Sequence, residues 1–401
     1  MALSKASVAE MQGIYGPFTM AERVLQKIWW RQDFLRRDLA LVGGQSLEII
    51  SPGRWNLLGG PDFHGARLRI NGQIVVGDVE VHFHQRDWHA HGHEQNPAYA
   101  NVVLHVVLFP PNEGQVPARR RDGGEIATVV LLPWLVRALE DYVVDDALEG
   151  MTDRDDSQAM LELADVPPEE LRARLHALAR ARWEQKRATA RLRIERVGWT
   201  NAAHATALEI LGYRRNRLPM LAVAERWPLE QWSAQLDVGT VMESVAERWA
   251  RHGVRPANQP TTRLRQYREW VQRKPDWPSD LAGWGQSLAK IVVREEVGTS
   301  VVRRSARLGQ LRADLVERVV GGAVGGDRLQ TLICDGFLPL CAAESGHDHF
   351  GLWFHWPAGD VPAVIPRLLR NLQVCDGKSH VANQGFAQGM LAWLIRREVF
   401  A

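Results

Sequence analysis

Acidic and imidazole side chains are concentrated between residues 60 and 105. The segment GPDFHGARLRINGQIVVGDVEVHFHQRDWHAHGH, residues 60–93, contains Asp62 and Glu80 and is rich in histidine. Carboxylate oxygens are the ligands that Mg²⁺ prefers, whereas imidazole nitrogens are typical zinc ligands. The segment therefore admits three interpretations: a site for a hard cation, a zinc site, or a solvated turn that happens to contain histidines.

The two acids lie on predicted strands joined by a tight turn. The alternating segments FHGARLRI and QIVVGDVEVHF flank Asn71-Gly72, and an Asn-Gly pair in this setting is the strongest short-range hairpin signal. Side chains alternate between the two faces of a strand. We therefore expect Glu80, His82 and His84 on one face and the apolar residues between them in the core.

The register of this hairpin decides whether the acids meet. An ideal two-residue turn places Asp62 opposite Val81, on the other side of the sheet from Glu80. One extra residue in either strand reverses that, because a one-residue slip flips the face. Gly65 and Gly77 lie inside the strands, where glycine often marks a bulge. We predict a bulge or a widened turn that brings Asp62 beside Glu80.

The spacing of the acids resembles a known nuclease pattern. Pro61-Asp62, seventeen further residues and then Glu80-Val81-His82 resemble the Pro-Asp…(Asp/Glu)-x-Lys motif of restriction-endonuclease-like nucleases. The predicted order of helix, strands, crossover and strand is also similar to that fold. The resemblance implies that Asp62, Glu80 and the carbonyl of Val81 bind Mg²⁺ or Mn²⁺, which activates water at a DNA or RNA phosphate. It also implies that Glu22, on the first helix, supplies a further acid.

His82 stands where that superfamily has lysine. An ammonium group orients the attacking water and offsets charge, whereas a histidine can act as a base or as a cation near neutral pH. Asp62, Glu80 and His82 are therefore the candidate catalytic residues of a phosphodiester hydrolase. The replacement also leaves open a catalytically inactive protein on the same fold, either nucleic-acid-binding or a scaffold.

The remaining histidines suggest pocket residues or a zinc hydrolase. His84, His93 and His105 are candidates to line the pocket as partners of the carboxylates, phosphate contacts or bases. Histidines 89, 91 and 93 alternate in a predicted loop and lack the HExxH spacing of a helical zinc site. Zinc is therefore the less favoured metal. It requires at least three histidine nitrogens that converge on one point.

Longer segments resemble an uncharacterised bacterial family, domain of unknown function 2851. PGRWN, GPDF, GDVEVHFHQRDWHAHGH and NPAYANVVLHVV look like its N-terminal signature. LGYRRNRLPMLAVAERWPL and RPANQPTTRLRQY look similar to its helical middle region. The resemblance extends from about residue 20 to at least residue 270, and it implies a family without supplying an activity.

The whole chain predicts an α+β protein. Its 401 residues correspond to two or three domains. We expect a restriction-endonuclease-like α/β core with a mixed sheet over 18–135, a helical domain over 136–320 and a C-terminal helical unit over 327–401. The joint is the GGAVGG segment, residues 321–326.

Basic residues recur in the helical part. The candidate nucleic-acid contacts are Arg182, Lys186, Arg187, Arg263 and Arg265, because Lys and Arg neutralise phosphates. Acids nearly balance the bases, with a net charge of +2, so these helices could instead form an interface with a partner protein or a second copy of the chain.

Composition and missing motifs exclude other classes. The three cysteines form no CxxC pair, which disfavours a disulfide framework and a thiolate zinc site. No P-loop, GxGxxG or GxSxG motif occurs, which disfavours ATP use, dinucleotide chemistry and acyl transfer. No signal peptide and no membrane-spanning stretch is evident. We expect a cytoplasmic protein without a membrane partner.

Overall fold

The structure, a computed structural model, describes residues 20–112, 114–153, 162–232, 236–246, 249–251, 254–293, 298–375 and 382–400. The chain is α+β, with a mixed sheet followed by a mostly helical part. This confirms the predicted class. The chain divides into two compact units, Met1–Val143 and Val144–Ala401, here called the sheet unit and the helical unit. The finer division at residues 320–327 stays a prediction.

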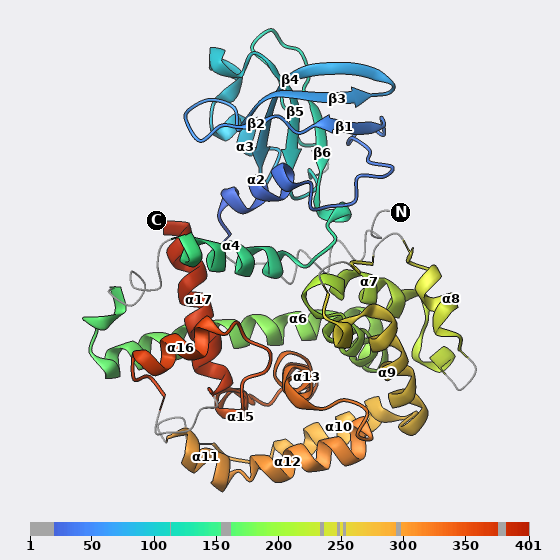
Figure 1. Cartoon of the computed structure of the whole chain (residues 1–401), viewed down its shortest axis with the longest axis vertical. Helices are drawn as coiled ribbons and strands as arrows, with labels where there is room; N and C mark the ends of the chain where they lie inside the picture. The colour runs from blue at the N-terminus through green and yellow to red at the C-terminus, as the bar shows by residue number, and fades with distance from the viewer. Residues whose placement is uncertain are drawn as a thin grey trace. The chain divides into compact units, whose positions relative to one another are not determined.

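One mixed sheet forms the sheet unit (Figure 1). Its strands are β1 (Leu47–Ser51), β2 (Arg54–Trp55), β3 (Phe63–Ile70), β4 (Gln73–His82), β5 (Val102–Val107) and β6 (Ala127–Val130). Their order is β1-β3-β4-β5-β6, with β2 beside β3. The first neighbours are antiparallel, whereas β4, β5 and β6 run parallel. A parallel neighbour requires a crossover, and the histidine-rich segment between β4 and β5 provides it.

The β3–β4 hairpin turns where the sequence predicts. Ile70 pairs with Gln73, so the loop consists of Asn71 and Gly72 alone. Both have positive φ, 46° and 84°, as the mirror-image turns that match strand twist require. The turn therefore sets one register for the strands that lead away from it.

That register changes before it reaches the acids. The ladder shifts by one residue between positions 63 and 66 of β3. Gly65 lies in this stretch with φ 66°, and its N–H donates to Asp78 Oδ1 at 3.0 Å. The shift brings Asp62 level with Glu80, so the predicted bulge is confirmed and located at Gly65.

Apolar groups cover the sheet next to these acids. Helix α2 (Glu22–Arg31) contacts β4 and buries Val24, Leu25, Ile28 and Trp29. The crossover contains α3 (Asp87–Ala90), η1 (His93–Gln95) and η2 (Pro97–Tyr99). Its residues Trp88 and Tyr99 join Val102, Ala118 and Ile126 in a buried cluster. The C-terminal half of β4 is consequently enclosed, and its polar side chains are buried with it.

The segment that follows α2 runs beside β6. The Val42 N–H donates to the Thr128 carbonyl at 2.8 Å. Nearby, the Tyr142 hydroxyl donates to the Asp33 carbonyl at 2.6 Å, and Arg137 pairs with the Asp33 carboxylate at 2.9 Å. These bonds tie the start of the sheet unit to its end.

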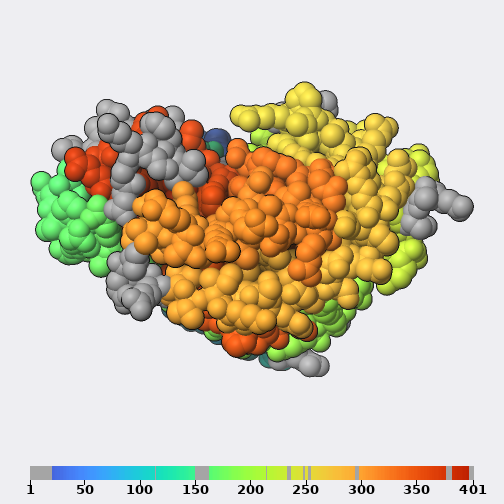
Figure 2. All heavy atoms as spheres, turned by 90° about the horizontal axis from the view of Figure 1, so that it is seen from below, coloured from blue at the N-terminus to red at the C-terminus, as the bar shows by residue number. Residues whose placement is uncertain are grey.

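The helical unit is built around one long helix. Helices α7, α14 and α17 contact α6. In the space-filling view of Figure 2, the yellow and orange segments of this unit form one continuous surface. The helices are α6 (Pro168–Leu211), α7 (Tyr213–Arg226), α8 (Val238–Glu243), α9 (Pro260–Arg273), α10 (Trp277–Leu288), α11 (Thr299–Ser305), α12 (Leu308–Leu315), α13 (Gly326–Thr331), α14 (Leu338–Ser345), α15 (Phe350–His355), α16 (Val364–Asn371) and α17 (Gln384–Phe400), after α4 (Leu139–Asp153) at the unit boundary.

The helical unit has two notable local features. Helix α6 is broken at Gly198, which has φ 76°. Within the segment HDHFGLWFHWPAGD, α15 forms around the fully buried Trp353. Among the described residues, no helix combines the length and apolar character needed to cross a membrane.

The bulge yields a stability prediction. Gly65→Ala is expected to lower the free energy of unfolding by about 1–2 kcal/mol, because a side chain disfavours the left-handed conformation. An added Cβ meets no atom within 4 Å, so a clash does not contribute. Gly65→Asn is expected to cost less, because Asn tolerates positive φ. Urea unfolding measures both, and equal stability of Gly65→Ala and wild type would contradict the strained position.

Candidate functional site

Asp62 and Glu80 are held together by backbone amides. The Asp62 N–H donates to Glu80 Oε2 at 3.0 Å, and the Val81 N–H donates to Asp62 Oδ2 at 3.0 Å. From α2, Gln26 Nε2 donates to Asp62 Oδ1 at 2.6 Å. The amide and carbonyl of one strand residue point to the same edge, so the Val81 carbonyl also faces the Asp62 side. The pair predicted from sequence is therefore brought together.

Glu22 completes an acidic group with this pair. Burial, and then the charges of Asp62, Glu80 and Asp87, raise the pKa of Glu22 to about 8. Burial and then the Glu80 charge raise the pKa of Asp62 to about 8. Burial likewise raises the pKa of Glu80 to about 8, although the Asp62 amide opposes this. Three acids that cannot easily ionise together form an environment that a divalent cation would relieve.

His82 does not supply the charge of the lysine it replaces. Its side chain is 1% exposed. Burial, followed by the charges of His105, His93 and His91, lowers the pKa of His82 to about 2. The imidazole is therefore neutral near pH 7 and is not the cation that the sequence comparison left open.

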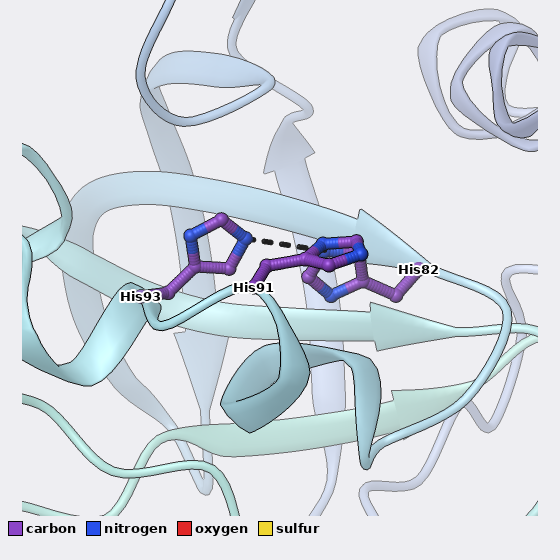
Figure 3. Close-up of side chains that lie close together, drawn as sticks. All are labelled: His82, His91 and His93. Atoms are coloured by element: carbon purple, nitrogen blue, oxygen red, sulfur yellow. Dashed lines mark hydrogen bonds between the residues drawn. The ribbon is translucent and has the colours of Figure 1, made fainter.

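Ring nitrogens from β4 and from the crossover converge on His82 (Figure 3). His82 Nε2 lies 3.1 Å from His91 Nδ1 and 3.3 Å from His93 Nε2. Glu80 Oε1 lies 3.4 Å from His82 Nε2 and 3.3 Å from His93 Nε2. Ligand atoms of the three histidines all lie within 4.8 Å of one another. We call His82, His91, His93 and Glu80 together the histidine cluster.

Buried neighbours hold the histidine cluster in place. His82 Nδ1 lies 2.9 Å from His105 Nε2, and His105 is fully buried. Burial, then nearby histidines, lowers the pKa of His105 to about 3. The His93 ring stacks on Tyr99 with centroids 3.9 Å apart. Burial, then the charges of Glu80 and Asp62, raises the pKa of Tyr99 to about 12.

His84 lies apart from this cluster. Strand β4 ends at His82, so alternation no longer directs His84 toward Glu80. Its ring stacks on Phe109 at 5.0 Å, and its N–H donates to Asp87 Oδ2 at 2.8 Å. The structure therefore places His84 beside Phe109 and Asp87, where the chain has bent into the crossover, and a pocket role for His84 stays a prediction.

The part of the chain that contains this site matches a known protein family. Residues 22–246 match a family described as a protein of unknown function (DUF2851). The chain belongs to the DUF2851 family. We found no match among curated proteins or among solved structures. Membership in DUF2851 thus confirms the predicted family over these residues, and the chemistry rests on the residues themselves.

Two members of the site in this DUF2851 chain were not singled out from the sequence. Gln26 lies one helical turn after Glu22 and reaches Asp62; helical i,i+4 spacing was the available signal. His91 lies in the predicted loop and is not among the site candidates that the sequence indicates. Loop residues have no fixed periodicity, so nothing in the sequence separated it from His89, which faces Glu94 Oε2 at 2.8 Å.

The helical unit does not present the predicted basic residues as a common surface. Arg182 is buried, and its Nε donates to Gln388 Oε1 at 2.7 Å. Arg263 is also buried, and its Nη1 donates to Gln266 Oε1 at 2.7 Å. Burial of both side chains disfavours contact with a phosphate, and nucleic-acid binding by these two stays a prediction.

The other three predicted phosphate contacts are more accessible. Lys186 Nζ pairs with Asp335 Oδ1 at 3.1 Å, and Arg187 Nη2 pairs with Glu184 Oε2 at 2.7 Å. Arg265 is exposed. Nucleic-acid binding by these three stays a prediction.

The raised pKa of Glu80 predicts a pH-dependent mutant. In unfolded chains this carboxyl titrates near 4.5 and in the fold near 8, so its contribution is fully present below pH 4.5 and is lost as the pH rises through 8. In EDTA, the stability of Glu80→Gln relative to wild type is therefore expected to increase from pH 5 to pH 8. Urea unfolding across that range measures it.

A matched control is Glu48→Gln, which changes an exposed acid of the same sheet that pairs with Arg69. It shows how the loss of one carboxylate charge outside the buried site affects stability at each pH. A Glu80→Gln difference that does not change between pH 5 and pH 8 would contradict the raised pKa of Glu80.

Proposed function

We propose that the sheet unit is a metal-dependent hydrolase of phosphodiester bonds in DNA or RNA, on a core related to the PD-(D/E)xK nucleases. The observation that carries this proposal is the bulge at Gly65, which brings Asp62 level with Glu80. The two carboxylates then exchange hydrogen bonds with each other's strand. A bulge that re-aims a side chain beside a site is a designed feature rather than a defect.

The order of elements supports the same core. Helix α2 precedes the antiparallel strands β1, β3 and β4, and a crossover leads to the parallel strand β5. The acids lie on β4 and just before β3, and Glu22 lies in the first turn of α2. This is the arrangement that the resemblance to the nuclease superfamily implies.

The donor set fits a hard divalent cation. Asp62, Glu80 and Glu22 offer carboxylate oxygens, and the Val81 carbonyl faces the same edge of β4. Mg²⁺ and Mn²⁺ favour such oxygen ligands. When bound, the ion would supply Lewis-acid stabilisation of the phosphate and a more acidic water. The chain's own contribution is to hold the carboxylates: the amides of Asp62 and Val81 fix one oxygen of each, and Gln26 orients Asp62.

One observation favours a second function. The lysine of the nuclease motif is replaced by a neutral, buried His82. No ammonium group therefore stands at that position to orient water. This supports a protein that binds nucleic acid, or acts as a scaffold, without cutting it. The two functions differ in whether binding is followed by cleavage.

Asp62→Asn and Glu80→Gln are predicted to abolish hydrolysis. Labelled single- and double-stranded DNA and RNA would be incubated with the wild type in Mg²⁺ or Mn²⁺. Each variant keeps a side-chain oxygen for the backbone amide but loses a charge. The rate is expected to fall by more than about 100-fold, beyond the loss typical of outer partners of a metal site.

Glu48→Gln serves as the control and is expected to cleave at the wild-type rate. Binding of the same substrates would be followed by fluorescence anisotropy. Binding without cleavage by the wild type would favour the second function. Cleavage that survives in both Asp62→Asn and Glu80→Gln would place the chemistry elsewhere.

A further inference from the structure

The hydrolase site leaves the histidine cluster unexplained. His82 Nε2 carries either one proton or one lone pair in the ring plane. It nevertheless faces His91 Nδ1, His93 Nε2 and Glu80 Oε1, all at 3.1–3.4 Å. One ring nitrogen cannot form three well-directed hydrogen bonds. A cation among the four atoms would satisfy all of them together.

We propose that His82, His91, His93 and Glu80 form a four-ligand site for a zinc-type transition-metal ion. Four ligand atoms at roughly 2.0–2.1 Å from a tetrahedral zinc ion lie about 3.3–3.4 Å from one another. Six distances join four atoms, and four of them are 3.1, 3.3, 3.4 and 3.3 Å, close to that edge length: the three from His82 Nε2 and the one between Glu80 Oε1 and His93 Nε2. Three imidazoles and one carboxylate also suit zinc rather than Mg²⁺.

The surroundings of the cluster resemble those of a built metal centre. A histidine that binds a metal through one nitrogen is usually oriented through the other, and His82 Nδ1 lies 2.9 Å from His105 Nε2. His93 is stacked on Tyr99. Glu80, His82 and His93 are buried, whereas His91 is exposed. The exposed histidine marks the side from which an ion enters.

The ligands come from two parts of the sheet unit, strand β4 and the crossover. Glu80 and His82 belong to β4, whereas His91 follows α3 and His93 begins η1. An ion held by all four would cross-link the crossover to β4. A site closed by four protein ligands is typical of structural zinc, which contributes directly to folding free energy. We assign this ion the role of holding the crossover against β4.

The histidine cluster shares Glu80 with the hydrolase site, but through different oxygens: Oε1 faces the histidines, whereas Oε2 accepts from the Asp62 amide. Asp62 and Glu22 are not members of the histidine cluster. His91→Ala is the decisive variant, since this side chain is exposed and its loss leaves the core intact. His89→Ala is the matched control: it lies in the same crossover but faces Glu94 and the Pro117 carbonyl.

Metal-free protein would be titrated with Zn²⁺ by calorimetry and with Co²⁺ by visible absorption. Wild type and His89→Ala are expected to bind one Zn²⁺ per chain and to show the intense spectrum of tetrahedral Co²⁺. His91→Ala is expected to bind Zn²⁺ at least about 100-fold more weakly. Zn²⁺ is expected to raise the melting temperature of wild type and His89→Ala but not of His91→Ala.

Three results would overturn the zinc site: no Zn²⁺ binding by the wild type, an octahedral Co²⁺ spectrum, or unchanged affinity in His91→Ala. Equal melting temperatures of His91→Ala and wild type in chelator would show that the variant is folded. Asp62→Asn separates the two proposals, because it is expected to lose hydrolysis while it keeps Zn²⁺ and the tetrahedral Co²⁺ spectrum.

Discussion

A one-residue shift in the pairing of β3 with β4 determines what the sheet unit can do. Strand side chains alternate with a period of two, so the shift transfers every residue beyond it to the opposite face. Without this shift, Asp62 would stand opposite Val81. The hydrogen bonds from the backbone amides of Asp62 and Val81, which hold Asp62 beside Glu80, would then not form. Gln26 would also lose its carboxylate partner. The acidic group therefore depends on the positive φ of Gly65, a conformation that suits glycine better than other residues.

Burial of the acids and histidines lowers the stability of the fold, which suggests that they are kept for a function. Buried carboxyls and imidazoles lose hydration, and here the acids are driven toward the protonated form while the histidines are driven toward the neutral form. Glu80 takes part in both groups: Oε2 accepts from Asp62, and Oε1 faces the histidines. Burial of the apolar side chains Trp29 and Trp88 contributes stability to the sheet unit. A protein that needed only a stable sheet would have no reason to keep such a group.

Local rules explain what the sequence predicted. The Asn-Gly turn and the alternation argument for a bulge depend on neighbouring residues alone, so both could be predicted without a structure. Three features could not be predicted from the sequence: that His91 belongs to the histidine cluster, that His84 lies apart from it, and that Arg182 is buried. Each depends on where a loop bends or on which helix covers a side chain, and both are set by tertiary packing. The neutral state of His82 follows from the same enclosure, because exposure rather than residue type decides its protonation.

The hydrogen bond from the Val42 N–H to the Thr128 carbonyl has a consequence for self-association of the chain. A strand at the edge of a sheet exposes backbone groups on which another chain can add a strand, and proteins suppress this by covering the edge. In this fold the segment after α2 occupies the Thr128 carbonyl of β6. An incoming strand would have to displace that segment before it could extend the sheet there. The segment after α2 thus hinders the addition of a strand from another chain at β6.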